Sequence, residues 1–124
     1  MIQLDVDVPD RPGELAKLAA ILGGARINID AISAESAGGR SYVSLIVNEP
    51  VQAREALVKG GYGCSTRTVL VVRLEDRPGA LADLAQKLGD AGVDILSAIH
   101  LGTVAGHAQL ALGVDNLEKA RSLV

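Results

Sequence analysis

The sequence contains one stretch twice, and this repetition restricts the folds open to the chain more than any other feature. The segment Asp-Arg-Pro-Gly-Glu-Leu-Ala-Lys-Leu begins at Asp10, and Asp-Arg-Pro-Gly-Ala-Leu-Ala-Asp-Leu begins at Asp76. Between residues 10–29 and residues 76–95, twelve of twenty positions are identical at a constant offset. A repeat this dense indicates two copies of one structural unit.

The length gives each copy about 60 residues, near the lower limit for a domain that folds alone. We place the first unit at residues 1–66 and the second at residues 67–124.

No apolar run approaches the roughly 18 residues of a membrane span, so we expect no membrane partner. A net charge of −3 and the absence of Trp and Phe argue against nucleic-acid binding. The single cysteine, Cys64, suits a cytoplasmic protein.

The first half predicts a strand, a helix, two strands and a second helix. Apolar residues alternate with aspartates over residues 4–8, which indicates a half-buried strand. Asp10 is predicted to cap a helix whose first turn contains Pro12. The apolar face of this helix is expected to comprise Leu15, Leu18, Ala19 and Leu22. A strand over residues 26–35 with a bulge near Asp30, a turn at Gly38-Gly39, a strand over residues 42–47 and a helix from Pro50 follow.

The second half repeats this order without a recognisable final strand. The predicted elements are a strand over residues 68–74, a helix over residues 78–90, strands over residues 93–101 and 106–114, and a helix capped by Asp115. Residues 64–74 contain no Gly or Pro, so they are expected to form one long strand that closes the first sheet and opens the second. Right-handed crossovers then predict an α+β fold of two tandem ferredoxin-like β-α-β-β-α-β units, with antiparallel sheets and helices on one face.

The repeated turn has the chemistry of a small-molecule site. A helix starting near Gly13, Glu14 and Leu15 offers free backbone N–H groups and a positive dipole end, which suit a carboxylate. Asp10 can accept hydrogen bonds from an ammonium group, and Asn28 can both donate and accept. The two residues are eighteen positions apart, and in a β-α-β unit we expect this spacing to bring Asn28 near Asp10. An α-amino acid carries both of the groups required. A purely structural turn, in which Asp caps, Pro starts the helix and nothing binds, is the alternative.

The Asp-Arg-Pro-Gly run, the Leu-rich helix after it and the following Ile-Asn-Ile resemble the ACT domain, a small-molecule-sensing β-α-β-β-α-β module. The resemblance covers essentially the whole chain as two tandem copies. It implies that an amino acid is bound across a domain interface. The implied contacts are Asp10, Gly13 and Asn28 in the first copy and Asp76, Gly79 and Asp94 in the second. Asp94 departs from the Asn pattern and adds a negative charge.

Other reactive residues offer weaker patterns. Arg11 could steer a ligand carboxylate, although an arginine in a solvated turn is the simpler interpretation. His100 and His107 flank a turn and could form a two-ligand metal site, but two exposed hairpin histidines are favoured. Cys64 is interpreted as a structural thiol. We find no catalytic triad, phosphate loop, cofactor motif or paired catalytic carboxylates, and so predict no catalytic residue, no metal and no cofactor.

These observations favour a non-catalytic regulatory protein that senses an amino acid and acts on a partner, which would be a regulated enzyme. A structural module that mediates assembly without a ligand is the alternative, and a hydrolase of the acylphosphatase type is a third possibility. The second unit lacks a fourth strand, so one sheet edge should carry unpaired backbone groups. We therefore expect a homodimer formed edge to edge or face to face.

Overall fold

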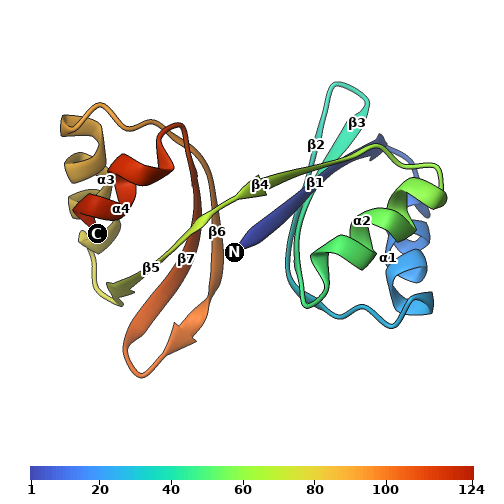
Figure 1. Ribbon diagram of the computed structural model, residues 1–124, viewed down its shortest axis with the longest axis horizontal. Coiled ribbons are helices and arrows are strands. Elements are labelled where there is room, and N and C mark those ends of the chain that lie inside the picture. The colour runs from blue at the N-terminus through green and yellow to red at the C-terminus, as the bar shows by residue number, and fades with distance from the viewer. The chain divides into compact units, whose positions relative to one another are not determined.

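The computed structural model describes residues 1–124, and the chain divides into two compact units. Residues 2–67 form the first unit, and residues 68–124 together with Met1 form the second. Each unit has a sheet with two helices on one of its faces, as Figure 1 shows. The fold is α+β, with two antiparallel sheets and four helices in tandem ferredoxin-like units.

The first unit follows the predicted order of elements. Its elements are β1 (Ile2–Pro9), α1 (Glu14–Gly24), β2 (Ile29–Ala37), β3 (Arg40–Val47), α2 (Pro50–Lys59) and β4 (Cys64–Thr68). The strands are ordered β2-β3-β1-β4, and β3 pairs antiparallel with both β1 and β2. The register of β2 shifts between Ile29 and Ala31, which confirms the predicted bulge. Gly38 and Gly39 form the predicted hairpin turn, both with positive φ.

The second unit repeats this arrangement with one strand fewer. Its elements are β5 (Leu70–Glu75), α3 (Ala80–Asp90), β6 (Ile95–Val104), β7 (His107–Val114) and α4 (Leu117–Leu123). The sheet has the order β5-β7-β6, with both pairings antiparallel. The predicted long strand over residues 64–74 is interrupted at Val69, so that β4 belongs to the first sheet and β5 to the second. The prediction of one continuous strand is therefore wrong, but the assignment of its two halves is confirmed.

Each unit has its own aliphatic core between its sheet and its helices. The core of the first unit comprises Leu4, Val6, Val8, Leu18, Leu22, Ile27, Val43, Leu45, Val47, Ala53 and Leu57. The core of the second unit comprises Val72, Leu84, Leu88, Val93, Leu110, Leu112 and Ala120. Alternate residues of each strand enter the core because successive side chains of a strand point to opposite faces. None of the helices is both long and apolar enough to span a membrane.

The predicted inward face of α1 is partly wrong. Leu18 and Leu22 are buried, but Leu15 is 46% exposed, and Glu14 is buried in its place. The same rotation recurs in α3, where Ala80 is buried and Leu81 is 50% exposed. The residues that face the core are therefore spaced by four, which is one of the two spacings that bring side chains onto one helical face.

Two predicted helix caps are also wrong. Helix α1 begins at Glu14 with Gly13 as its N-cap, so neither Asp10 nor Pro12 belongs to the helix. Helix α4 is capped by Asn116, whose side chain accepts a hydrogen bond from the Lys119 amide at 3.0 Å. Asp115, the predicted cap, lies one residue earlier and instead accepts from the backbone amide of Asp94 at 2.9 Å.

Candidate functional site

The two Asp-Arg-Pro-Gly turns have the same backbone geometry. Gly13 and Gly79 both adopt φ 88° and ψ −10°, a left-handed conformation that L-residues with side chains rarely adopt. The amide of Asp10 donates to the Gly39 carbonyl at 3.1 Å, and the amide of Asp76 donates to the Gly106 carbonyl at 2.8 Å. Each turn is thus held against the hairpin of its own sheet, and glycine is required where the chain enters the helix.

The first turn presents a carboxylate and a helix N-terminus together. Lys17 is the first residue of α1 to donate back along the helix, to the Gly13 carbonyl at 3.0 Å. The first turn of a helix leaves amide groups without an intrahelical acceptor, and the helix dipole makes this end positive. The side chain of Asp10 is exposed and makes no hydrogen bond or salt bridge. The N-terminus of α1 can therefore bind an anion, and the unpaired carboxylate of Asp10 lies three residues before the N-cap, Gly13.

Beneath the first turn lies a buried carboxylate that the sequence did not predict to be buried. Glu14 is only 7% exposed, and its Oε1 accepts a hydrogen bond from Arg11 Nε at 2.6 Å. Its Oε2 accepts from the Tyr62 hydroxyl at 3.3 Å, which joins α1 to the loop before β4. The hydrogen bond from Arg11 lowers the pKa of Glu14, against the opposing effect of desolvation. Burial, together with the charge of Glu14, raises the pKa of Tyr62.

A cavity of about 370 Å³ opens beside this cluster. Its lining residues are Asp7, Pro9, Arg11, Glu14, Lys17, Arg40, Gly60, Gly61, Tyr62 and Gly63. Arg40 pairs with Asp7 at 3.1 Å, and Lys17 Nζ lies 5.9 Å from the centre of the Tyr62 ring. Sequence reasoning missed Lys17, Arg40 and Tyr62 as site residues. The one available signal was Tyr62, which is an aromatic residue within a run of glycines.

The second turn lacks this buried cluster. Ala80 occupies the position of Glu14 and is buried, and its methyl side chain cannot form the hydrogen bonds that Glu14 forms. Arg77 instead forms salt bridges with the exposed Glu75 and Asp83, at 2.9 Å and 3.1 Å. These hydrogen bonds, Asp83 first, raise the pKa of Arg77. Asp76 and Gly79 keep the geometry of the first turn, so the two copies differ in what supports the turn rather than in its backbone.

Asn28 lies at the opposite end of the first sheet from Asp10. In the strand registers Ile29 is opposite Val47, whereas Pro9 is opposite Arg40 at the other end of β3. The structure therefore brings Asp10, Arg11, Gly13, Glu14 and Leu15 together but not Asn28, and the expectation that the spacing brings Asn28 near Asp10 within one unit is wrong.

Local contacts hold Asn28 in the first unit and the equivalent Asp94 in the second unit in place. The Asn28 side chain donates to Asp30 at 2.7 Å, and its backbone amide donates to Asn48 at 3.0 Å. Asp94 is placed in the same way in the second unit, with its amide bound to Asp115. Each of these residues lies before the first strand that follows the helix, β2 or β6.

The two histidines do not face each other. Val104, not His100, is paired with His107, and His100 is opposite Leu110. The ring of His100 contacts Thr103, and the ring of His107 contacts the Ala105 carbonyl. No group of three or more His, Cys, Asp or Glu side chains could hold a metal ion. The metal-site alternative therefore has no geometric support.

The pairing of Glu14 gives a pH-dependent expectation. Its pKa is lowered in the folded state, so its contribution to stability is present above the unfolded pKa and is lost as the pH falls through the folded pKa. We expect wild type to be more stable than Glu14→Gln at neutral pH, and the difference to shrink below about pH 4. Urea unfolding at several pH values measures it, with the exposed Glu55→Gln as a matched control. A difference independent of pH would contradict the ion-pair account.

Comparison with known proteins places this geometry in a family. The family model described as an ACT domain pair matches residues 1–124. No match to the sequence was found among curated proteins.

Solved structures share the fold at low sequence identity. Protein BT0572 from Bacteroides thetaiotaomicron is similar with a TM-score of 0.89 and 22% identity, over 98% of this chain and 84% of that one. The ligand-free regulatory subunit of aspartate kinase from Thermus thermophilus has a TM-score of 0.72 and 22% identity, over 98% and 89% of the two chains. The match of the family model over the full length shows that the protein belongs to the ACT domain pair family.

Proposed function

We propose that the protein is a non-catalytic regulatory module that binds an α-amino acid at its first Asp-Arg-Pro-Gly turn and acts on a partner protein. Its family supports a ligand-sensing role, and one of its structural neighbours is a regulatory subunit of aspartate kinase. A regulatory subunit acts on a catalytic subunit that is a separate polypeptide, and we propose the same relation for this chain and its partner enzyme. The identity of such an enzyme does not follow from the fold.

The observation that carries this proposal is the unpaired Asp10 carboxylate beside the N-terminus of α1. Asp10 is exposed and makes no side-chain contact, although it was predicted to serve as the helix cap. A zwitterion fits this arrangement, with its carboxylate at the helix amides and its ammonium group on Asp10. The exposed side chain of Leu15 lies on the same turn and offers an apolar contact for the ligand side chain.

An assembly module without a ligand is the competing function. It is favoured in the second unit, where Asp94 replaces Asn and adds a negative charge. A thermal-shift screen of the twenty amino acids separates the two functions. A ligand present at a hundred times its Kd adds about 2.7 kcal/mol to the stability of the folded state. The assembly module would show no shift with any of them.

The matched repeat provides a sharp test of the site. We expect Asp10→Ala to weaken binding of the amino acid found in the screen about tenfold or more, because a charge-assisted hydrogen bond contributes about 1.5–3 kcal/mol. Asp76→Ala removes the equivalent carboxylate from the second turn and should change the affinity less than twofold. Isothermal titration calorimetry measures both variants. Equal loss in the two variants, or no loss in Asp10→Ala, would refute the assignment to the first turn.

We also propose that the protein is a homodimer. Asn28 is separated from Asp10 within the first unit, so a site that uses both residues needs a second molecule. Strand β2 begins next to Asn28 and is an edge strand of its sheet, with Ile32 exposed on it. Pairing between copies along β2 would protect this edge. Sedimentation at micromolar concentration should give twice the monomer mass of 12.8 kDa, and a strict monomer with and without amino acids would contradict it.

A further inference from the structure

The polar cavity of the first unit is lined by more cations than anions, although the whole chain is acidic. It has a volume of about 370 Å³ and opens between the end of β1, the start of α1 and the loop from α2 to β4. The charged residues that line it are Asp7, Arg11, Glu14, Lys17 and Arg40. Because the net charge of the chain is −3, this local excess of positive charge runs against the composition. The amino-acid site proposed at the first turn uses none of these side chains.

Both carboxylates of the cavity are already paired. Asp7 accepts hydrogen bonds from Arg40 Nε at 3.3 Å and from Arg40 Nη2 at 3.1 Å. Glu14 accepts from Arg11 Nε at 2.6 Å. The ammonium group of Lys17, by contrast, forms no salt bridge. One positive charge of the cavity is therefore left without a salt-bridge partner.

The polar groups of the cavity that remain free are mainly donors. The two terminal nitrogens of Arg11 and the Nη1 nitrogen of Arg40 donate to no protein group. Lys17 adds the three N–H groups of its ammonium. Guanidinium and ammonium groups bind anionic oxygens through short, charge-assisted hydrogen bonds. The cavity therefore fits a ligand that carries a negative charge and several acceptor oxygens.

The end of α2 opposes an anion in this cavity only weakly. The C-terminus of a helix is negative where its last carbonyl groups are unpaired. Here three of these carbonyls, those of Ala56, Leu57 and Val58, accept hydrogen bonds from amides of the loop that follows. Gly61 and Gly63 of this loop line the cavity, and a Cβ at either position would meet no atom within 4 Å. The loop thus leaves room for a ligand beside the three cations.

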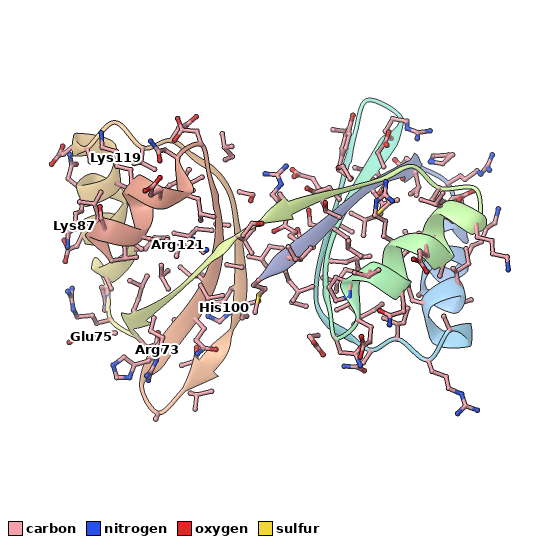
Figure 2. All side chains as sticks on the ribbon, in the orientation of Figure 1. Arg73, Glu75, Lys87, His100, Lys119 and Arg121 are labelled. Carbon is pink, nitrogen blue, oxygen red and sulfur yellow. The ribbon has the colours of Figure 1, made fainter.

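The second repeat lacks the unpaired cation. Asp83 occupies the position of Lys17 at the constant offset of the repeat. Its carboxylate accepts from Arg77 Nη2 at 3.1 Å. Glu75, which Figure 2 labels on β5, pairs with the same arginine at 2.9 Å. The chain therefore contains its own comparison, in which a carboxylate at the position of Lys17 pairs with the arginine of the turn.

We propose that the cavity of the first unit binds the phosphate group of a small anion through Arg11, Lys17 and Arg40. A phosphate group carries close to two negative charges and three acceptor oxygens, which match three separate cationic donors better than a carboxylate does. The volume is near the lower end of the range for small-molecule sites, so the rest of the ligand is small. A phosphate monoester and inorganic phosphate share this chemistry, and a titration with each distinguishes them.

Isothermal titration calorimetry of the full chain, in the absence of amino acids, tests the chemistry of the ligand. The probes are glycerol 3-phosphate and inorganic phosphate, and the control is succinate, which carries two negative charges on planar carboxylates. We expect the tighter of the two phosphates to bind about tenfold more tightly than succinate. Tighter binding of the ester identifies a phosphate monoester as the ligand, and otherwise the ligand is the free ion. Succinate binding as tightly as both phosphates, or no phosphate binding at millimolar concentration, would overturn the proposal.

A variant copied from the second repeat locates the site. Lys17→Asp should weaken phosphate binding about tenfold or more, because it removes the unpaired cation and supplies a carboxylate that competes for Arg11. Lys119→Asp makes the same charge change on α4, where Figure 2 labels Lys119, and should leave the affinity almost unchanged. Equal loss of affinity in these two variants, or none in a folded Lys17→Asp, would contradict the location.

A second variant, on a different element, keeps the test open if Lys17→Asp does not fold. Arg40→Gln removes a donor and leaves the carboxylate of Asp7 unpaired in the cavity, so it should also weaken phosphate binding about tenfold. Circular dichroism checks that each variant remains folded. Unchanged phosphate affinity in a folded Arg40→Gln would count against the proposal.

Amide chemical shifts separate this cavity from the N-terminus of α1, which can also bind an anion. In the ¹⁵N-labelled protein, phosphate should shift the amides of Tyr62 and Gly63, while those of residues 79–81 at the second turn stay unchanged. Shifts confined to the amides of residues 13–15 would place the ion at the end of the helix and would overturn the proposal.

Discussion

Leu18→Ala is expected to lower the free energy of unfolding by about 2–5 kcal/mol, the cost of removing a large aliphatic side chain from a packed core. Leu18 is fully buried between α1 and the first sheet, where it belongs to the aliphatic core. Leu15→Ala makes the same chemical change three residues earlier, at a side chain that is 46% exposed. We expect it to change stability by no more than about 0.5 kcal/mol in the absence of ligand.

The two leucine variants measure the rotation of α1 about its axis. Urea unfolding followed by far-UV circular dichroism suits the comparison, because the chain has no Trp to report by fluorescence. Equal destabilisation by both changes would mean that Leu15 faces the core, as the apolar pattern alone predicts. Leu84→Ala and Leu81→Ala repeat the comparison in α3 and should give the same ranking.

Gly13→Ala and Gly23→Ala are expected to change stability in opposite directions. Gly13 has φ 88°, and an L-residue in the left-handed region costs roughly 1–2 kcal/mol. Gly23 lies within α1 with helical φ, and a Cβ there would meet nothing within 4 Å. Alanine at that position should stabilise the helix by up to about 1 kcal/mol, because glycine is the poorer helix former.

The sign of each glycine effect, more than its size, tests the turn. Thermal unfolding of the two variants and of Gly79→Ala measures it, and Gly79→Ala should destabilise the second unit as Gly13→Ala does the first. Stabilisation by Gly13→Ala would mean that the turn reaches the helix by another backbone path. The measurement is made without amino acids, so that a change in ligand binding does not enter the comparison.

The sequence predicted the architecture well because the signals of strands and turns are local. Each signal can be read from a few neighbouring residues. Examples are the alternation of apolar residues and aspartates before Pro9, the glycine pair between β2 and β3, and the repeated Asp-Arg-Pro-Gly motif. The face of α1 could not be predicted in the same way. A pattern of apolar residues selects Leu15 over Glu14, and burial of Glu14 becomes favourable only through Arg11 and through Tyr62, which lies 48 residues away along the chain.

The site was predicted less completely, because the direction in which each strand runs decides at which end of the sheet a residue lies. Asp10 follows the end of β1, whereas Asn28 precedes the start of β2, and the β1–β3 and β2–β3 registers put these points at opposite ends of the sheet. A motif match gives residue types but not their positions in the fold. The prediction that Asp10 caps α1 was wrong because Gly13, in a left-handed conformation, occupies the N-cap position that aspartate commonly fills.

The hydrogen bond between Glu14 and Tyr62 makes the two copies mechanically unequal. In the first copy, the turn that carries Asp10 is tied through Glu14 to the loop from which β4 leaves. In the second copy, alanine replaces this glutamate, and the side-chain salt bridges of the turn are those of Arg77 with Glu75 on the preceding strand and Asp83 on the following helix. The first turn is therefore linked by side-chain hydrogen bonds to the segment that leads into an edge strand, β4, and the second turn has no equivalent of this link.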